Sequence, residues 1–237
     1  MVSIRSIATG VIPVFAFFIT ITAAHADEPP QRRGEAPGNP GYEAPPTDPA
    51  KGARGGLNRI GRGVPQDYAE AMRRYIGAAD REFAAGQDLI GSLYENGWGV
   101  KRDYAEAMRW YRKGADQGFA RSQTDVGWLY QNGWGVPRDY AEAMRWYRKA
   151  ADQGLARAQN NIGDLYYGGL GVRRDPAEAA RWYRQAADQG YAPAEYNLGR
   201  AYEHGFGVKA NAAQACDWYQ KAADDGNKQA EQWLASR

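Results

Sequence analysis

Apolar residues along most of the chain follow two alternating stripes, each with the spacing of an amphipathic helix. One stripe carries Val126, Leu129 and Tyr130, and the other carries Met108 and Tyr111. Both stripes return in the same order further along the chain. The pattern therefore predicts pairs of helices, which we call helix A and helix B in chain order, and not strands.

The helical pattern repeats with a fixed period. The string DYAEAMRWYRK at Asp103 recurs unchanged at Asp139. Equivalent positions lie 36 residues apart, at Asp67, Asp103, Asp139, Asp175 and Asn211. Such a period indicates a stacked array, in which each unit packs on its neighbours and the whole offers an extended surface instead of one deep pocket.

Each helix has predicted ends. Asp103 followed three positions later by Glu106 is typical of a capping box, in which each side chain satisfies a free backbone amide at the start of helix B. Glycine closes a helix because it adopts the left-handed conformation easily. Helix B is predicted to end at Gly118, Gly154, Gly190 and Gly226, and helix A at Gly97, Gly133, Gly169 and Gly205.

Glycine also recurs inside helix A, where it costs about 1 kcal/mol relative to alanine. The positions are Gly91, Gly127, Gly163 and Gly199. We expect a close approach of helix B there, through its alanines Ala107, Ala143, Ala179 and Ala215. The loop residues Trp98 and Trp134 are predicted to fill gaps between units, with an exposed aromatic patch as the alternative.

The N-terminal part of the chain differs from the repeats. Residues 1–26 have a basic start, an apolar run and a small-x-small site before Asp27, which predicts a signal peptide cut after Ala26 and a periplasmic or secreted protein. An uncleaved membrane anchor is the alternative. Residues 27–56 are rich in proline and glycine and predict a disordered linker. The repeats occupy 57–237, as four full helix pairs with partial end units.

Composition narrows the classes of function. The net charge of +2 argues against nucleic-acid binding, and no stable membrane insertion is expected once the signal is removed. The single cysteine, Cys216, excludes an intramolecular disulfide. It lies in register with Met108 and Met144, which predicts a buried core position.

The repeat resembles a known family. The pattern is carried by Ala158, Ile162, Gly163, Leu165, Tyr166, Gly169, Gly171, Val172, Asp175, Ala179, Trp182, Tyr183, Gln185, Ala186, Ala187 and Gly190. It is similar to the Sel1-like repeat, a relative of the tetratricopeptide repeat. The resemblance implies an all-α, right-handed α-solenoid of antiparallel helix pairs that acts as a protein adaptor. Cysteine-rich relatives are linked to penicillin or peptidoglycan binding, but this chain lacks their cysteines.

Residues that differ between equivalent units are the candidates for partner binding, because packing explains the invariant ones. They form a stripe on helix A, which the resemblance places on the concave wall. The stripe comprises Asp88, Ser92, Glu95, Thr124, Trp128, Gln131, Asn160, Asp164, Tyr167, Tyr196, Arg200 and Glu203. Trp, Tyr and Arg are the types that most often anchor a protein partner. A merely solvated stripe is the alternative.

Catalysis is not expected. Beyond the signal, His204 is the only histidine, and no metal-ligand, cofactor or nucleophile motif accompanies it. The predicted function is an exported adaptor that binds a protein or peptide on the concave stripe. One alternative is a cell-wall or polysaccharide binder that uses aromatic residues and a basic ridge on helix B, such as Arg109, Arg112 and Lys113. A β-lactamase-like hydrolase is a further alternative.

Overall fold

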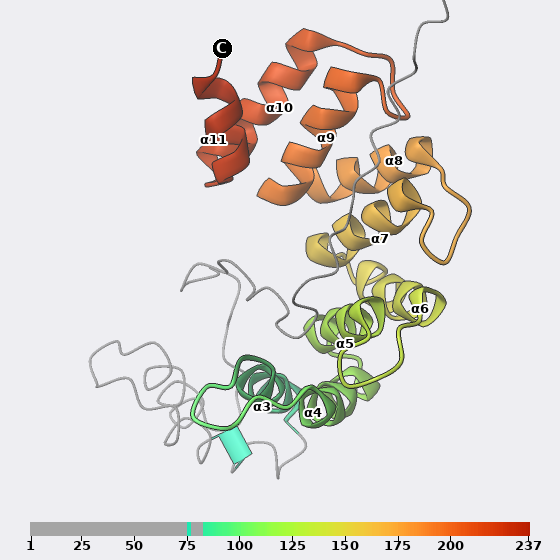
Figure 1. Cartoon of the computed structure of the whole chain (residues 1–237), viewed down its shortest axis with the longest axis vertical. Helices are drawn as coiled ribbons and strands as arrows, with labels where there is room; N and C mark the ends of the chain where they lie inside the picture. Colours follow the sequence, from blue (N-terminus) through green and yellow to red (C-terminus); the bar gives the residue numbers. More distant parts are fainter. Residues whose placement is uncertain (1–74, 77–82) are drawn as a thin grey trace, which may run out of the picture. The chain divides into compact units, whose positions relative to one another are not determined.

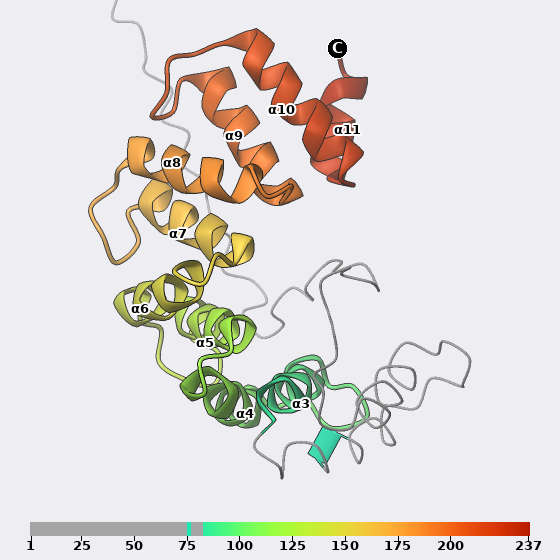
Figure 2. The same ribbon diagram turned by 180° about the vertical axis from the view of Figure 1, so that it is seen from behind.

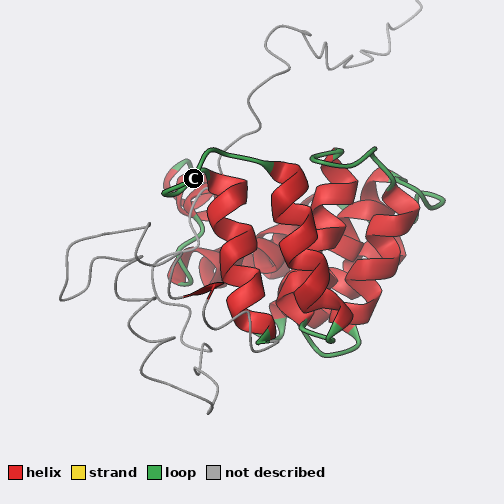
Figure 3. Cartoon of the chain, turned by 90° about the horizontal axis from the view of Figure 1, so that it is seen from below, coloured by secondary structure: helices red, strands yellow, loops and turns green. Residues whose placement is uncertain are grey.

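The computed structural model describes residues 75–76 and 83–237. Within these ranges the chain consists of helices and loops, without strands (Figure 3). The helices are α3 (Ala84–Asn96), α4 (Tyr104–Asp116), α5 (Ala120–Asn132), α6 (Tyr140–Ala151), α7 (Ala156–Gly168), α8 (Pro176–Ala187), α9 (Ala192–His204), α10 (Ala212–Asp224) and α11 (Lys228–Ala235). The predicted signal peptide, the linker and most of the helix B predicted from Asp67 lie outside the described residues.

The helices follow the predicted order of A and B. Helices α3, α5, α7 and α9 are helix A, helices α4, α6, α8 and α10 are helix B, and α11 is a lone helix A. Each helix packs on the next one in the chain (Figures 1 and 2). This is the predicted right-handed α-solenoid of antiparallel pairs, and helix A begins about two residues earlier than predicted. No helix in the described part of the chain is both long and apolar enough to cross a membrane.

The caps of helix B are confirmed in part. The Asp103 carboxylate accepts hydrogen bonds from the backbone amides of Ala105 and Glu106, at 2.9 and 3.0 Å. The predicted return bond from Glu106 is wrong, because the amide of Asp103 donates to the carbonyl of Tyr94 and Glu106 pairs with Arg109. The side-chain cap recurs at Asp139, Asp175 and Asn211. The cap residue thus also ties the start of helix B to the end of helix A.

The close approach at the glycines inside helix A is confirmed, and the predicted partner Ala143 takes part at Gly127, but the nearest atoms belong to a tyrosine that was not predicted. A Cβ atom on Gly127 would lie 2.7 Å from ring atoms of Tyr147, and 3.2 Å from the carbonyl oxygen of Ala143. The other three glycines face the equivalent rings of Tyr111, Tyr183 and Tyr219. The chief contact is therefore between the ring of a helix B tyrosine and the helix A backbone at the glycine.

The second glycine of each loop joins neighbouring repeats. Gly135 has a φ of 71°, and a Cβ atom there would lie 2.4 Å from the carbonyl carbon and oxygen of Tyr104, in the preceding repeat. The same contact joins Gly171 to Tyr140 and Gly207 to Pro176. The Gly-x-Gly motif therefore packs a loop against the first turn of the previous helix B.

Cys216 departs from its predicted burial. Met108 lies in one core cluster with Trp146 of the next repeat, and Met144 lies in a cluster against which Trp182 packs. Cys216 is exposed. Among the described residues, α10 is followed only by the short α11, which brings no helix B tryptophan to this position. The prediction of a core cysteine is wrong because the covering residue belongs to the next helix B.

We expect the Cys216 thiol to react fully with a thiol reagent in the folded protein, at a rate close to that of the unfolded chain. The measurement is the absorbance released from a disulfide reagent, with and without urea. As a control, a cysteine introduced at Met144 should react only after unfolding. Protection of Cys216 until the chain unfolds would contradict this account.

Candidate partner-binding surface

The twelve stripe residues divide into two groups by burial. Asp88, Glu95, Thr124 and Asn160 are buried, with at most 5% of their surface exposed. Ser92, Trp128, Gln131, Asp164, Tyr167, Tyr196, Arg200 and Glu203 are half-buried. We call these eight residues the helix A surface. The buried four stabilise the array from within, so a partner could contact only the other eight directly.

Several stripe residues hold the helix B tyrosines in place. The tyrosine hydroxyls donate from Tyr111 to Glu95 at 2.5 Å, from Tyr147 to Gln131 at 2.8 Å and from Tyr219 to Glu203 at 2.7 Å. In the third described repeat the equivalent position is Tyr167, and Asp164 accepts from Tyr183 at 2.8 Å instead. The residue types at these positions are therefore limited by the need to accept a hydrogen bond from the tyrosine, and not only by exposure to solvent.

Asp88 belongs to a buried charge network between α3 and α5. Its carboxylate lies 3.1 Å from Arg121 Nε and accepts a hydrogen bond of 2.9 Å from Ser122. Asp125 pairs in turn with Arg157 of α7 at 2.5 Å. Burial, and then the neighbouring charge of Asp125, raise the pKa of Asp88 to about 7. These polar groups connect successive A helices.

Asp164 is the centre of a second polar cluster, between α7 and α9. Its carboxylate accepts from Tyr183, from Asn160 at 3.2 Å and from Asn197 at 3.4 Å. Burial raises the pKa of Asp164 to about 6, against the hydrogen bond from Tyr183 and the charge of Arg200. Both carboxylate oxygens are therefore engaged by donors of the chain itself.

Trp128 is partly covered by the chain itself, which leaves less of its ring for a partner to contact. Its ring lies edge-on to Trp134 of the following loop, with centroids 5.9 Å apart. Trp134 also contacts the ring of Tyr104 in the preceding repeat, at 5.2 Å. Trp134 and Trp98 both pack partly buried against core clusters. The two loop tryptophans thus fill gaps in the array, and Trp134 covers part of Trp128.

A small pocket opens on the helix A surface among α7, α8 and α9. It has a volume of about 70 Å³. Its lining comprises Asp164, Tyr167, Pro176, Ala180, Tyr183, Asn197, Arg200, Ala201 and Phe206. The rings of Tyr167 and Phe206 form one wall, with centroids 5.6 Å apart. The pocket brings together three predicted stripe residues, namely Asp164, Tyr167 and Arg200.

The pocket arises from smaller side chains at one junction between repeats. Pro176, Ala180 and Phe206 stand where the first described junction has Tyr104, Met108 and Trp134. In addition, Arg200 stands where that junction has Trp128. At the first junction, Tyr104, Trp128 and Trp134 pack together. At the third junction the residues in their places leave a space. Sequence reasoning missed this pocket because its walls come from three helices and a loop.

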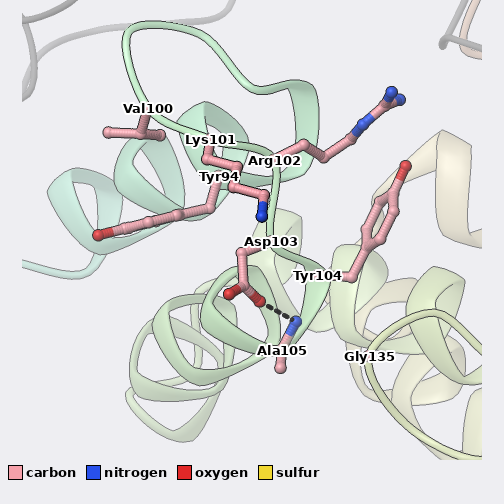
Figure 4. A pocket seen from close by; sticks show the side chains of 8 residues that line it. All are labelled: Tyr94, Val100, Lys101, Arg102, Asp103, Tyr104, Ala105 and Gly135. Carbon is pink, nitrogen blue, oxygen red and sulfur yellow. Dashed lines mark hydrogen bonds between the residues drawn. The ribbon is translucent and has the colours of Figure 1, made fainter.

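A larger hollow of about 710 Å³ lies beside the first described loop (Figure 4). It is lined by Tyr94, Val100, Lys101, Arg102, Asp103, Tyr104, Ala105 and Gly135. The Asp103 carboxylate in this lining is turned to the amide of Ala105, as the cap requires (Figure 4). The hollow is built from a capping turn and a loop contact of the kind that recurs in the other described repeats, and it includes none of the twelve stripe residues.

The basic residues of the B helices contact tryptophan rings and a glutamate of the same helices or of the neighbouring helix B. Two cations lie over the ring of Trp146, namely Arg112 at 4.8 Å from the centroid and Lys149 at 4.0 Å. Arg184 and Lys221 lie over the ring of Trp218 in the same way. The ridge residues Arg109 and Lys113 contact Glu106 and Trp110. These tryptophan faces are therefore covered by cations of the chain.

Comparison with known proteins identifies the repeat. The family model described as Sel1 repeat matches residues 56–80, 84–119, 120–155, 156–191 and 192–227. The chain belongs to the Sel1 repeat family. Four of the five matched units coincide with the helix pairs α3–α4, α5–α6, α7–α8 and α9–α10, and the unit at 56–80 lies mostly outside the described residues. A comparison with curated proteins found no match.

Solved structures share the Sel1 repeat fold. A Sel1 repeat protein from Oxalobacter formigenes is 36% identical, with a TM-score of 0.71 over 76% of this chain and 72% of that one. A protective antigen of uropathogenic Escherichia coli is 40% identical, with a TM-score of 0.68 over 77% of this chain. This chain spans only 39% of that antigen. An immunity protein from Pseudomonas aeruginosa is 26% identical, with a TM-score of 0.58 over 78% of this chain and 70% of that one.

The Sel1 repeat commonly mediates protein–protein interaction and is a non-catalytic scaffold fold. The stripe predicted from the sequence lies on the A helices of this fold. His204, the histidine considered above, is exposed and lies beside Glu203 and the ring of Phe206. The absence of enzymatic activity stays a prediction.

The Sel1 repeat at 192–227 differs from the other described repeats in a partly buried polar pair. In the earlier repeats two glutamines bond across neighbouring helices, as Gln117 to Gln87, Gln153 to Gln123 and Gln189 to Gln159, all at 2.7 to 2.8 Å. Asp225 and Glu195 occupy these positions in the repeat at 192–227, so two carboxyl groups replace the two amides. Burial, and then the charge of Asp225, raise the pKa of Glu195 to about 7, against the charge of Lys221.

We expect the stability of this end of the array to fall as the pH rises from about 5 to 8. The folded pKa of Glu195 lies above its ordinary value of 4.5, so the folded chain holds the proton more tightly and loses this stabilisation as pH passes through 7. Denaturation at pH 5 and pH 8 measures the effect. Glu195→Gln restores the amide of the other repeats and should remove this part of the pH dependence; an unchanged dependence would contradict the account.

Proposed function

We propose that this Sel1 repeat protein is an exported scaffold that binds a protein partner on the helix A surface. The observation that carries the proposal is the α7–α9 pocket, where Tyr167, Phe206 and Arg200 meet on the stripe that varies between repeats. A pocket of about 70 Å³ is far below the roughly 300–1,000 Å³ typical of small-molecule sites. It suits one side chain of a larger partner.

The tryptophan rings of the B helices are covered by cations, which favours a protein partner over a glycan. Sugar rings would stack on exposed aromatic faces, whereas two cations of the chain lie over each of the rings of Trp146 and Trp218. On the helix A surface, Arg200 has no such aromatic contact among the described residues. A partner that combines apolar and polar side chains therefore matches the helix A surface better than a glycan matches helix B.

Capture of exported proteins by the purified chain tests the binding face. We expect Tyr167→Ala and Arg200→Ala to lower the recovery of a specific partner. Arg181→Ala is the matched control, because Arg181 lies on helix B with 74% of its side chain exposed. Equal recovery by both helix A variants and the control would refute the proposed face.

Export is the second part of the proposal, and it rests on the first 26 residues of the sequence. Fractionation of cells that express the whole chain tests it, together with sequencing of the N-terminus of the recovered protein. The expected product lies outside the cytoplasm and begins at Asp27. A product that keeps Met1 and stays in the cytoplasm would refute export and leave the binding face to be judged on its own.

A further inference from the structure

Arg200 stands out among the pocket residues because its guanidinium bonds to no acceptor in the described part of the chain. Among residues 75–76 and 83–237, no hydrogen bond or ion pair engages it, and its influence on Asp164 is purely through its charge. Other arginines close to the A helices are paired, as Arg121 is with Asp88 and Arg157 with Asp125. A half-buried guanidinium with free donors at a pocket is suited to bind an acceptor from outside the chain.

The carboxylates nearest in the fold do not meet this need. Both oxygens of Asp164 accept hydrogen bonds from Tyr183, Asn160 and Asn197. Glu203, one turn further along α9, accepts from Tyr219 and Trp233 and pairs with Arg237. Donors of the chain therefore hold each acid in its present place. Within the described part of the chain no acceptor is bonded to Arg200, and a carboxylate from a partner offers the planar two-oxygen group that matches the guanidinium fork.

The aromatic wall determines what accompanies the carboxylate. Tyr167 and Phe206 flank the cavity beside Arg200, and Pro176 and Ala180 add apolar lining. The small volume of the cavity, about 70 Å³, suits a small apolar side chain. The helix A surface also continues to both sides, to Gln131 in the preceding repeat and to Glu203 further along α9. An extended segment can thus pass across the pocket without ending there.

We propose that Arg200 binds the carboxylate of an aspartate or glutamate within an extended segment of the protein partner, while a neighbouring small apolar side chain enters the α7–α9 pocket. This inference rests on the proposed function, since it specifies the chemistry of the partner at the proposed face. The bidentate contact between Arg200 and the carboxylate fixes where the segment lies along the array. The apolar side chain in the pocket adds buried apolar surface.

A charge-swap selection tests the proposal with a defined probe. A library of random peptides, displayed with their C-termini fused to the carrier, is selected on the wild-type chain and on Arg200→Glu. We expect an acidic residue at one fixed position next to a small apolar residue on the wild type, and a basic residue at that position on Arg200→Glu. The fused C-termini ensure that any carboxylate selected comes from a side chain.

Affinities of the selected acidic peptide complete the test. Arg200→Ala should weaken its binding roughly 10- to 100-fold, as expected for loss of hydrogen bonds to a charged group. Arg200→Lys should restore only part of this, because lysine keeps the charge without the fork. Arg181→Ala should bind as the wild type does. Thermal unfolding of each variant shows whether the fold is kept.

The possible outcomes separate this inference from the proposed function. Peptides that are enriched without an acidic position, and whose binding is lost in Tyr167→Ala but kept in Arg200→Ala, would overturn the role of Arg200 and leave the binding face in place. Enrichment of the same acidic peptides on Arg200→Glu would also overturn it. If neither protein enriches any peptide, both the inference and the proposed face fail.

Discussion

Gly135→Ala is expected to lower the free energy of unfolding by about 3 kcal/mol or more, although it adds only one methyl group. Gly135 has a φ of 71°, a conformation that costs an alanine roughly 1–2 kcal/mol. The new Cβ would in addition lie 2.4 Å from the carbonyl group of Tyr104, which is backbone and cannot rotate away. Relief requires the loop to separate from the preceding repeat.

Gly154→Ala is the matched control for this prediction. Gly154 also has a positive φ, 86°, but no described atom lies within 4 Å of the Cβ position. It should lose only the roughly 1–2 kcal/mol of the conformational term. Thermal unfolding measures the difference, at roughly 2–4 °C per kcal/mol for a domain of this size. Equal losses in the two variants would show that the contact between repeats contributes nothing.

Gly127→Ala is expected to destabilise the chain by about 2 kcal/mol, reversing the usual sign of this substitution. An alanine normally stabilises a helix interior by about 1 kcal/mol relative to glycine. Here the added Cβ would lie 2.7 Å from the ring of Tyr147. That ring is fully buried, and its hydroxyl donates to Gln131, so it has little room to move.

A double-mutant cycle tests whether Tyr147 is the cause. In a Tyr147→Ala background, which itself lowers stability, Gly127→Ala should become neutral or stabilising. Gly168→Ala serves as the control, since it lies in the last turn of α7, where a Cβ would approach only the side chain of Leu170, at 3.1 Å. If Gly127→Ala stabilises the chain in the wild-type background, the aromatic contact is not tight.

The helix pairs could be predicted from the sequence because a repeated pattern carries its own register. One period places the caps, such as Asp103, and the closing glycines, such as Gly133, and the structure has both. The same logic failed at Cys216, because register alone does not say whether a following repeat covers a position. It also failed for Glu106, which was expected to accept a hydrogen bond from the amide of Asp103. That amide donates to the carbonyl of Tyr94 instead, and Glu106 pairs with Arg109.

The candidate site was harder to predict, because it depends on differences in side-chain volume between repeats. Treating each variable position of helix A as a surface position overlooked the hydroxyl of the helix B tyrosine, which makes Glu95 an internal acceptor. The pocket beside Arg200 results from Ala180 and Phe206 replacing larger residues on separate elements. A single-sequence pattern indicates which positions vary, but the space they leave appears only when the helices are packed.

Site-specific photocrosslinking tests the central claim, that a partner binds on the A helices, most directly. A photoreactive benzophenone residue is placed at Tyr167 on the helix A surface or at Arg181 on helix B, and each protein is irradiated with the exported fraction. The account predicts a discrete covalent adduct with a partner from position 167 and none from position 181. Adducts from position 181, with none from position 167, would contradict it.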